Sequence, residues 1–181
     1  TYQDLPFHNF RHAYHVTISA NKLMDLMLCT TEDSDNNGYG RDEQSPKPPT
    51  FGLRDDPCAL AALIFAALIH DAEHKGIANR RMVEEEHELA LLYNDQSIHE
   101  QRSLHLAFEE LLDERYIDLR EAMFPEPEDY REFRMAVVNM VMSTDLTNPE
   151  RTQITKSKFK EAFGAGIHPE TMDQRQVRRS S

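Results

Sequence analysis

The sequence predicts an all-α protein, and three observations support this fold class. The segments rich in apolar residues contain good helix formers and have helical spacing. No window shows sustained alternation of apolar and polar residues or a convincing hairpin turn, so we expect essentially no sheet. Prolines and helix-start signals divide the second half of the chain into segments of helical length. With 181 residues, we expect a single compact core.

Composition excludes several classes of protein. The net charge of −12 argues against general nucleic-acid binding, which depends on clustered Lys and Arg. The longest apolar run, residues 58–69, is too short to span a membrane, so we expect no direct membrane contact. Cys29 and Cys58 lack the spacing of a zinc site and read as small buried residues of a reducing compartment. The expected location is the cytoplasm, or the cytoplasmic side of a membrane-anchored parent protein.

The first helix is predicted over residues 12–29. Its apolar positions fit one amphipathic helix: Val16, Ile18, Leu23, Leu26 and Met27. Residues 30–57 are rich in Asp, Asn, Gly and Pro, a composition typical of a disordered insert. We interpret this segment as an insert between two core helices and not as a domain boundary.

The next two helices are predicted over residues 59–69 and 81–93. The first is apolar on all sides and should be buried, with Asp55 or Asp56 as its cap and Pro57 in its first turn. The second has an apolar side opposite a run of glutamates. Its apolar residues are Met82, Val83, Leu89 and Leu92.

Three more helices follow. One runs from Ser97 to about Leu112, and another follows the chain break at Pro125 and Pro127. The apolar positions of the latter are predicted to belong to the core and not to a nucleotide pocket: Tyr130, Phe133, Val137, Met140 and Val141. Asn148 and Pro149 signal the start of a last helix through residue 163. Residues 1–163 therefore form the predicted domain, and 164–181 a polar, frayed tail.

The strongest sign of chemistry is the sequence His-Asp-Ala-Glu-His at residues 70–74, directly after the apolar helix. Imidazole and carboxylate groups at a helix end can converge on one divalent ion, and His74 lies one turn after His70. A metal would offset the cost of burying these ionisable groups. The alternative is that the cluster marks the point where the helix emerges into water.

A second group of histidines lies near the start of the chain. His8, His12 and His15 have helical spacing and share one side, which is consistent with either a site or a polar helix face. Joined with the first cluster, His12, His70 and Asp71 form a nitrogen and oxygen ligand set suited to zinc. The carboxylate could bridge to a second ion, Mg²⁺ or Mn²⁺, and two such ions would activate water against a phosphate ester. His8 could protonate the leaving oxygen.

Two acids have two interpretations each. Glu100 could orient metal-bound water, or it could complete a capping box with Ser97. Asp145 lies near a helix C-terminus, where the macrodipole disfavours an acid, which suggests a partner such as a ligand histidine. Alternatively, it is a turn residue. The remaining histidines are interpreted as ordinary surface or edge residues: His87, His99, His105 and His168.

Four motifs resemble those of the class I cyclic-nucleotide phosphodiesterases, within the HD-type metal phosphohydrolases. Residues 7–13 are similar to Tyr-His-Asn-x-x-His-Ala, and residues 70–79 to His-Asp-x-x-His-x-Gly-x-x-Asn. Residues 93–100 resemble Tyr-Asn-Asp-x-Ser-x-x-Glu, and residues 143–146 resemble Ala-Thr-Asp-Met. The motifs occur in the family's order and cover residues 1 to about 160.

The resemblance implies a phosphodiesterase-type helical bundle, truncated at its C-terminus, that hydrolyses the cyclic phosphodiester of cAMP or cGMP in signal transduction. It implies a tightly held zinc and a magnesium or manganese ion bridged by Asp71. Regulatory domains would lie elsewhere in a longer parent protein. The implied residues are His8 as proton donor, His12, His70 and Asp71 as ligands, and His74, Asn79, Glu100, Thr144 and Asp145 as supporting residues.

The chain departs from the family pattern in four places. Residues 101–103 read Gln-Arg-Ser where a His-His pair usually follows the glutamate, and Pro149 stands where a histidine is frequent. The insert over residues 30–57 is longer than the usual connection. The family's later metal-binding aspartate and purine-binding glutamine are not found. Alternatives to the enzyme are therefore a non-catalytic helical fragment that binds a metal or a partner, and another HD-type phosphohydrolase.

Overall fold

The computed structural model describes residues 2–28 and 53–163, and these residues are helical wherever they are regular, with no strand among them. This confirms the all-α class. Most of the predicted insert, the predicted tail, Cys29 and His168 lie outside the described residues. The elements are α1 (Phe10–Leu28), η2 (Leu53–Asp55), α2 (Pro57–Ile69), α3 (Asn79–Glu84), α4 (Glu88–Leu92), α5 (Ile98–Leu111), η3 (Glu114–Tyr116), α6 (Ile117–Met123), α7 (Pro127–Met142) and α8 (Pro149–Phe163).

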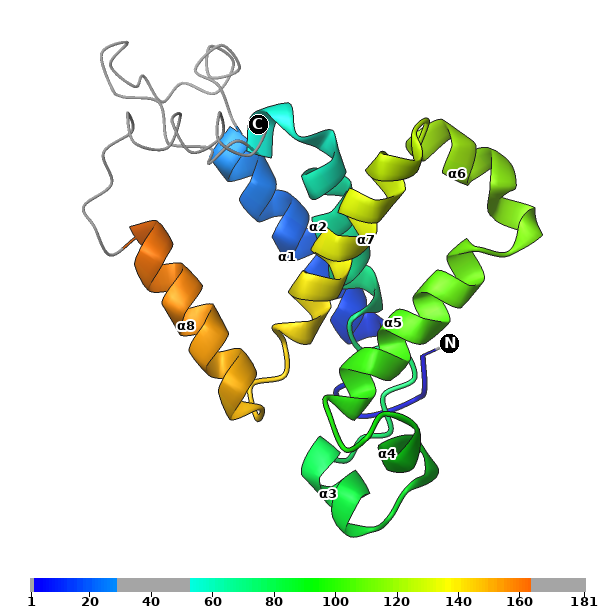
Figure 1. Ribbon diagram of the computed structural model, residues 1–181, viewed down its shortest axis with the longest axis vertical. Helices are drawn as coiled ribbons and strands as arrows, with labels where there is room; N and C mark the ends of the chain where they lie inside the picture. The colour runs from blue at the N-terminus through cyan, green and yellow to red at the C-terminus, as the bar shows by residue number, and fades with distance from the viewer. Residues whose placement is uncertain (1, 29–52, 164–181) are drawn as a thin grey trace.

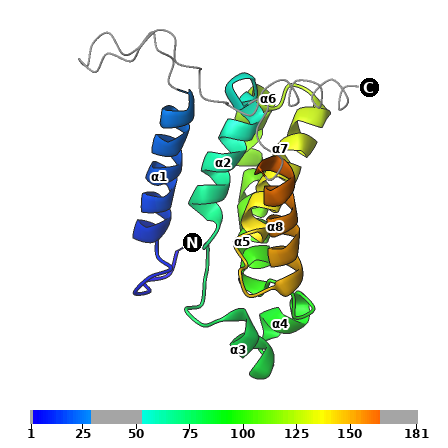
Figure 2. The same cartoon turned by 90° about the vertical axis from the view of Figure 1, so that its left-hand side faces the viewer.

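The central helix of the fold is α2, which packs against α1 on one side and against α7 and α5 on the other. Figure 2 shows α1, α2 and the α5–α7 pair as successive layers. The core fills the space between α2, α5 and α7 with small residues of α2 and larger residues of its partners. Its buried members are Ala62, Ala66, Ile69, Leu104, Phe108, Leu111, Phe133, Val137, Val141 and Met142.

The start of α2 follows the sequence prediction. The Asp56 side chain accepts a hydrogen bond from the Ala59 N–H at 2.8 Å, and Pro57 occupies the first turn. A carboxylate at this position also interacts favourably with the helix dipole. Because Leu53–Asp55 form a 3₁₀ turn and α2 begins at Pro57, the predicted disordered insert extends too far at its C-terminal end.

The core interpretation of α7 is confirmed. Pro127 starts this helix, and the Asp129 carboxylate accepts the Glu126 N–H at 3.0 Å. Phe133, Val137 and Val141, at helical spacing, are fully buried in the core.

The predicted apolar face of α1 is wrong in detail. The helix forms, but Ile18, Leu23 and Leu26 are exposed, and the buried residues are Ala13 and Met24. Among the described elements α1 packs substantially only against α2. The small residues of α2 allow the two helices to approach closely. The side of α1 that contacts α2 is therefore narrow, and its buried residues are the small Ala13 and the flexible Met24.

The predicted helix over residues 81–93 is also wrong, because the chain bends between α3 and α4. Glu86 has a φ of 52°, and the His87 side chain caps α4 by accepting the Leu89 N–H at 3.1 Å. The bend allows α3, α4 and the start of α5 to bury a second small cluster instead of one helix face. Its buried residues are Met82, Leu89, Ala90 and Ile98, while Leu92, predicted to be apolar-facing, is exposed.

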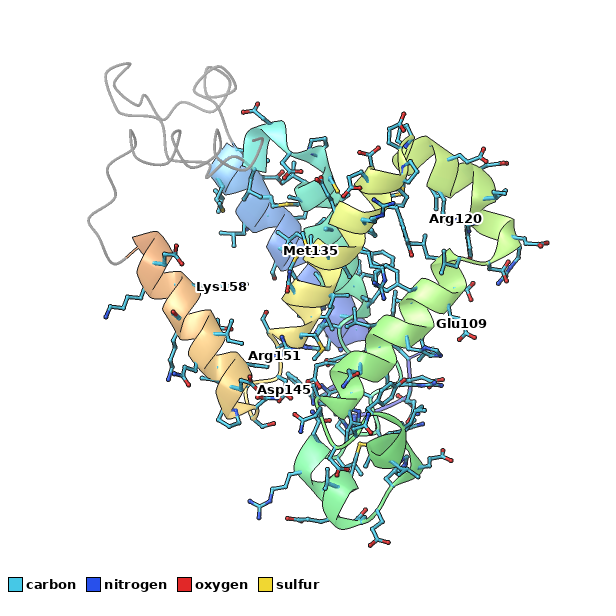
Figure 3. All side chains as sticks on the ribbon, in the orientation of Figure 1. Glu109, Arg120, Met135, Asp145, Arg151 and Lys158 are labelled. Carbon is cyan, nitrogen blue, oxygen red and sulfur yellow. The ribbon has the colours of Figure 1, made fainter. Side chains whose placement is uncertain are left out.

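Two further features concern the segment after α5. The short helix α6 was not predicted, and it follows a turn that Asp113 closes by accepting the Arg115 N–H at 2.9 Å. Arg120 of α6 donates to the carbonyls of Leu111 and Asp113 at 2.7 and 2.8 Å, which ties α6 to the end of α5 (Figure 3).

The last helix begins as predicted. Asn148 accepts the N–H groups of Glu150 and Arg151, both at 3.1 Å. In Figure 1, α8 runs apart from the layers of α1, α2 and α7, to which residues 143–148 connect it. No helix in the described ranges is long and apolar enough to cross a membrane.

Candidate metal centre

The candidate metal centre lies where the start of α1 meets the end of α2. The Asn9 side chain determines the first part: it donates to the Leu5 carbonyl at 2.6 Å and accepts the His12 N–H at 3.0 Å. This N-cap places His8 just before α1 and His12 in its first turn. On the other side α2 ends at Ile69, and His70 and Asp71 follow directly.

Asp71 is the central residue of this site. Its Oδ2 atom lies 2.9 Å from His8 Nδ1, 3.2 Å from His70 Nε2 and 3.5 Å from His12 Nε2. Burial alone would raise the pKa of Asp71, but hydrogen bonds from His70 and His8 outweigh it and hold the pKa well below its usual range. The carboxylate is therefore ionised at neutral pH. The structure thus brings the two predicted histidine clusters together.

The residues His12, His70 and Asp71 fit a metal ion. Their ligand atoms all lie within 4.8 Å of one another. Two ligands each about 2.1 Å from a tetrahedral ion are separated by about 3.4 Å, close to the distances found around Asp71 Oδ2. The His70 Nδ1 atom lies 3.0 Å from the Ala67 carbonyl, so Nδ1–H donates there, and a metal ion that displaced the Nε2 proton would find the Nε2 lone pair as its ligand.

A second group that could hold an ion consists of His8, Asp71 and His74, and it shares the Asp71 carboxylate with the first. One hydrogen bond disfavours His74 Nδ1 as a ligand atom. His74 Nδ1 accepts the Gly76 N–H at 2.9 Å, so the neutral ring carries its proton on Nε2 and is a donor there. Burial lowers the pKa of His74 to about 4, with His99 and His8 adding to the effect, so this ring is neutral at pH 7.

Three imidazole rings stack in a column beside the centre. The rings of His8 and His74 are 3.8 Å apart with an interplanar angle of 12°, and those of His74 and His99 are 3.8 Å apart at 17°. The interpretation of His99 as a surface or edge histidine is therefore wrong. His99 is buried, and its Nε2 lies 2.8 Å from the Ile77 carbonyl. By contrast, His105 is exposed beside Glu109, as predicted, and His87 caps α4.

Glu100 and Asn79 form a hydrogen-bonded pair next to this column. Asn79 Nδ2 donates to Glu100 Oε2 at 2.9 Å, and Asn79 Oδ1 accepts the His99 N–H at 3.1 Å. The capping box proposed between Ser97 and Glu100 is not formed, since Ser97 makes no side-chain cap bond among the described residues and has a φ of 41°. Burial raises the pKa of Glu100, and the carboxylates of Asp145 and Asp71 act in the same direction.

Thr144 and Asp145 lie in the connection from α7 to α8, as Figure 3 shows for Asp145. Thr144 Oγ1 donates to the Val141 carbonyl at 2.7 Å and caps the end of α7. Asp145 is buried and accepts the backbone N–H of Thr147 at 3.1 Å and the Thr147 hydroxyl at 2.7 Å. Burial opposes ionisation of Asp145, but the bonds from Thr147 keep its pKa below the usual value. The turn interpretation of Asp145 thus describes its bonds, and a ligand histidine is not its partner within the described residues.

Sequence reasoning missed two residues that contact the site. The Tyr2 hydroxyl donates to the Leu68 carbonyl at 2.5 Å, and burial followed by the Asp71 charge raises the pKa of this tyrosine. Arg102 donates to Glu73, in the turn that follows α2, at 2.9 and 3.1 Å. The position of Arg102, two residues after the glutamate that ends the motif at residues 93–100, was a usable signal, whereas Tyr2 has no motif around it.

Comparison with known proteins places this site in a family. The sequence model of the 3′5′-cyclic nucleotide phosphodiesterases matches residues 7–177. The chain belongs to this family. A 3′,5′-cyclic-AMP phosphodiesterase of Drosophila melanogaster is 32% identical over 145 residues, which are 80% of this chain and 18% of that protein. The human dual specificity calcium/calmodulin-dependent 3′,5′-cyclic nucleotide phosphodiesterase 1C is 38% identical over 88 residues, 49% of this chain and 12% of that protein.

Solved structures agree with this phosphodiesterase assignment. The phosphodiesterase domain of the rhodopsin phosphodiesterase from Salpingoeca rosetta aligns with a TM-score of 0.65 and 28% identity, over 96% of this chain and 45% of that one. The present chain therefore spans less than half of that phosphodiesterase domain and less than a fifth of the Drosophila enzyme.

Proposed function

We propose that the chain is the metal-binding part of an enzyme that hydrolyses 3′,5′-cyclic nucleotides, cAMP or cGMP, to 5′-nucleoside monophosphates. The observation that carries this proposal is the convergence of His8, His12 and His70 on one buried, ionised carboxylate, Asp71. Family membership supplies the reaction class. The proposed substrate is a cyclic nucleotide. Calcium/calmodulin dependence is a property named for the human relative, and we do not propose it for this chain.

We further propose that His12, His70 and Asp71 hold Zn²⁺ and that Asp71 is shared with a Mg²⁺ or Mn²⁺ ion. When bound, the ions would supply an activated water and neutralise phosphate charge. Two hydrogen bonds to the backbone orient the imidazole rings of the site. The Ala67 carbonyl accepts the His70 Nδ1–H, which directs His70 Nε2 toward the ion. The Gly76 N–H donates to His74 Nδ1, which leaves the His74 proton on Nε2. Asn79, Glu100, Thr144 and Asp145 are proposed as supporting residues around the centre.

His8 is the proposed proton donor. Asp71 is an acceptor, so the proton of the His8 Nδ1 atom faces the carboxylate and Nε2 is the atom that faces away from it. As the P–O3′ bond breaks and water oxygen bonds to phosphorus, a proton on His8 Nε2 would pass to O3′. Removal of a positioned general acid lowers rates by about 10²–10⁴-fold.

The test is hydrolysis of cAMP and cGMP with Zn²⁺ and Mg²⁺ by this chain and by a form extended with downstream coding sequence. We expect the extended form to be active, His70→Ala to abolish activity, and His8→Asn to lower kcat by about 10²–10⁴-fold. His105→Gln, at an exposed histidine distant from Asp71 in the bond network, is the matched control. Bound metal without hydrolysis in either form would favour the non-catalytic alternative, and hydrolysis of other phosphoesters alone would favour another HD-type activity.

A further inference from the structure

Arg102 and Ser103 occupy the positions where the family motif usually has a His-His pair, and both contact the turn that follows α2. Arg102 donates from Nε and Nη2 to Glu73 Oε2 at 3.1 and 2.9 Å. Ser103 is fully buried, and its hydroxyl donates to the Ala72 carbonyl at 3.0 Å. Two adjacent residues of α5 therefore bind two adjacent residues of the turn.

The turn that they bind has an unfavourable backbone conformation. Glu73 has a φ of 56°, in the left-handed region, which costs a non-glycine residue roughly 1–2 kcal/mol. Such a conformation persists where the surrounding contacts hold it in place. Among the described residues, the side-chain contact that holds Glu73 is the ion pair with Arg102.

This turn determines where two site residues lie. Asp71 precedes it, His74 follows it, and the His74 N–H closes it by donating to the Asp71 carbonyl at 3.1 Å. If Glu73 left the left-handed region, the direction of the chain after Ala72 would change, and His74 would move relative to Asp71. The stack of His74 on His99 provides a further link to α5.

The Arg102–Glu73 ion pair is less exposed to water than the Arg81–Glu85 pair on α3. The side chains of Arg102 and Glu73 are 25% and 26% exposed, whereas those of the Arg81–Glu85 pair are 66% and 51% exposed. Exposed pairs on one helix contribute little, because solvent and salt screen them. The Arg102–Glu73 pair is less screened and joins two separate segments, so it can constrain their relative position.

We propose that Arg102 is a positioning residue of the metal centre: its ion pair with Glu73, beside the Ser103–Ala72 bond, holds the turn that places Asp71 and His74. The metal consequence rests on the proposed function. The holding of the turn stands on the contacts alone.

The first experiment uses the metal-free chain, so it does not depend on the proposed function. Amide hydrogen exchange of His74 is compared in the parent, in Arg102→Gln and in Arg81→Gln as the matched control. We expect Arg102→Gln to speed His74 exchange by at least about tenfold while the amides in the middle of α2 exchange as in the parent. Arg81→Gln should leave His74 unchanged. Equal His74 exchange in parent and Arg102→Gln would overturn the proposal.

The second experiment measures zinc affinity by competition with a chromophoric chelator. Loss of a direct partner of a metal ligand typically weakens binding about 10–100-fold, and because Arg102 acts on the ligands only through Glu73 and the turn, we expect Arg102→Gln to weaken binding by about tenfold, the lower end of that range. Arg102→Lys keeps the charge and should recover most of the affinity. Glu73→Gln should weaken binding as much as Arg102→Gln, and the double variant should show no additional loss.

The two experiments separate the two ideas. If the parent binds no zinc, the proposed function fails, and the exchange measurement still decides whether Arg102 holds the turn. If the parent binds zinc and Arg102→Gln binds it equally tightly, the role of Arg102 in positioning the metal ligands is wrong. Full additivity of Arg102→Gln and Glu73→Gln would likewise contradict the pair.

Discussion

Asn79 shows how one amide can connect two site residues that come from another helix. Its side chain donates to Glu100 and accepts the backbone N–H of His99. Glu100 is half-buried, so its ionised form depends on this donor. Both atoms of the amide are used, and a substitution therefore affects both neighbours at once.

We predict that Asn79→Ala destabilises the metal-free chain by about 1–3 kcal/mol and that the loss grows as pH rises. Burial raises the pKa of Glu100 above its unfolded value of about 4.3, so protonated Glu100 favours the folded state below that pH, and this contribution is lost as pH rises through the folded pKa. Loss of the Asn79 donor raises the folded pKa further. Urea denaturation from pH 4 to pH 7 measures the trend.

Asn139→Ala is the control for this prediction, because Asn139 is an exposed residue of α7. It should change the free energy of unfolding by less than about 0.5 kcal/mol at every pH. A penalty for Asn79→Ala that is constant from pH 4 to pH 7 would show that the His99 bond matters and the Glu100 bond does not.

At the scale of the element, the start of α2 depends on one side chain. Asp56→Ala removes the bond to the Ala59 N–H and the favourable interaction of an anion with the helix dipole. We expect a loss of about 1 kcal/mol in the free energy of unfolding, measured by urea denaturation. Asp55→Ala, at the exposed neighbour within η2, should cost less. Equal costs would contradict the assignment of Asp56 as the cap.

The largest loss of stability that we predict for one substitution lies on the buried face of α7. Phe133 is buried, and its ring contacts Phe124 and Phe65 with centroids 4.9 and 5.5 Å apart. Phe133→Ala should cost about 3–5 kcal/mol. Met135→Ala on the exposed face of the same helix, marked in Figure 3, should stay within about 0.5 kcal/mol. Thermal and urea unfolding of the two variants check this contrast.

The capped starts of α2 and α8 were predictable from sequence, whereas the starts of α4 and α6, the bend between α3 and α4 and the packing face of α1 were not. Asp56 and Asn148 act through N–H groups two or three residues away, so the local sequence contains all the information. The bend at Glu86 instead depends on burial of Met82 and Ile98 in one cluster, a long-range effect. No local pattern opposes a continuous helix there.

For the whole molecule, we predict that bound zinc raises the free energy of unfolding. The proposed ligands come from α1 and from the end of α2, so an unfolded chain would not present them together. Free zinc at about 100 times its Kd should raise the free energy of unfolding by about 2.7 kcal/mol, and chelation should reverse the effect. Thermal unfolding with and without zinc measures it.

Two histidine variants test the origin of that stabilisation. His12→Gln should abolish most of it, while His15→Gln, one turn further along α1 and exposed, should retain it. Equal stabilisation of both variants would mean that zinc binds elsewhere.

Much of the site could be predicted from sequence, because its motifs are short. His70 and Asp71 are neighbours, and His8 and His12 lie in one short motif on either side of the Asn9 N-cap, outside and inside α1, so only the meeting of the two motifs required the fold. His99 could not be placed, because its burial results from packing of α5 against the turn at residue 73. Its own neighbours in sequence indicate nothing of that contact.

The antiparallel arrangement of α1 and α2 determines where the chain can accept insertions. His12 at the first turn of α1 lies beside His70 after the last turn of α2, so the two helices run antiparallel, as Figures 1 and 2 show. The connection from Leu28 to Leu53 joins the opposite ends, about 24 Å along α1 from His12 at about 1.5 Å per residue. Each doubling of such a connection adds only about 0.6 kcal/mol of closure entropy. Insertions can accumulate there across relatives while the chemistry at the other end stays under selection.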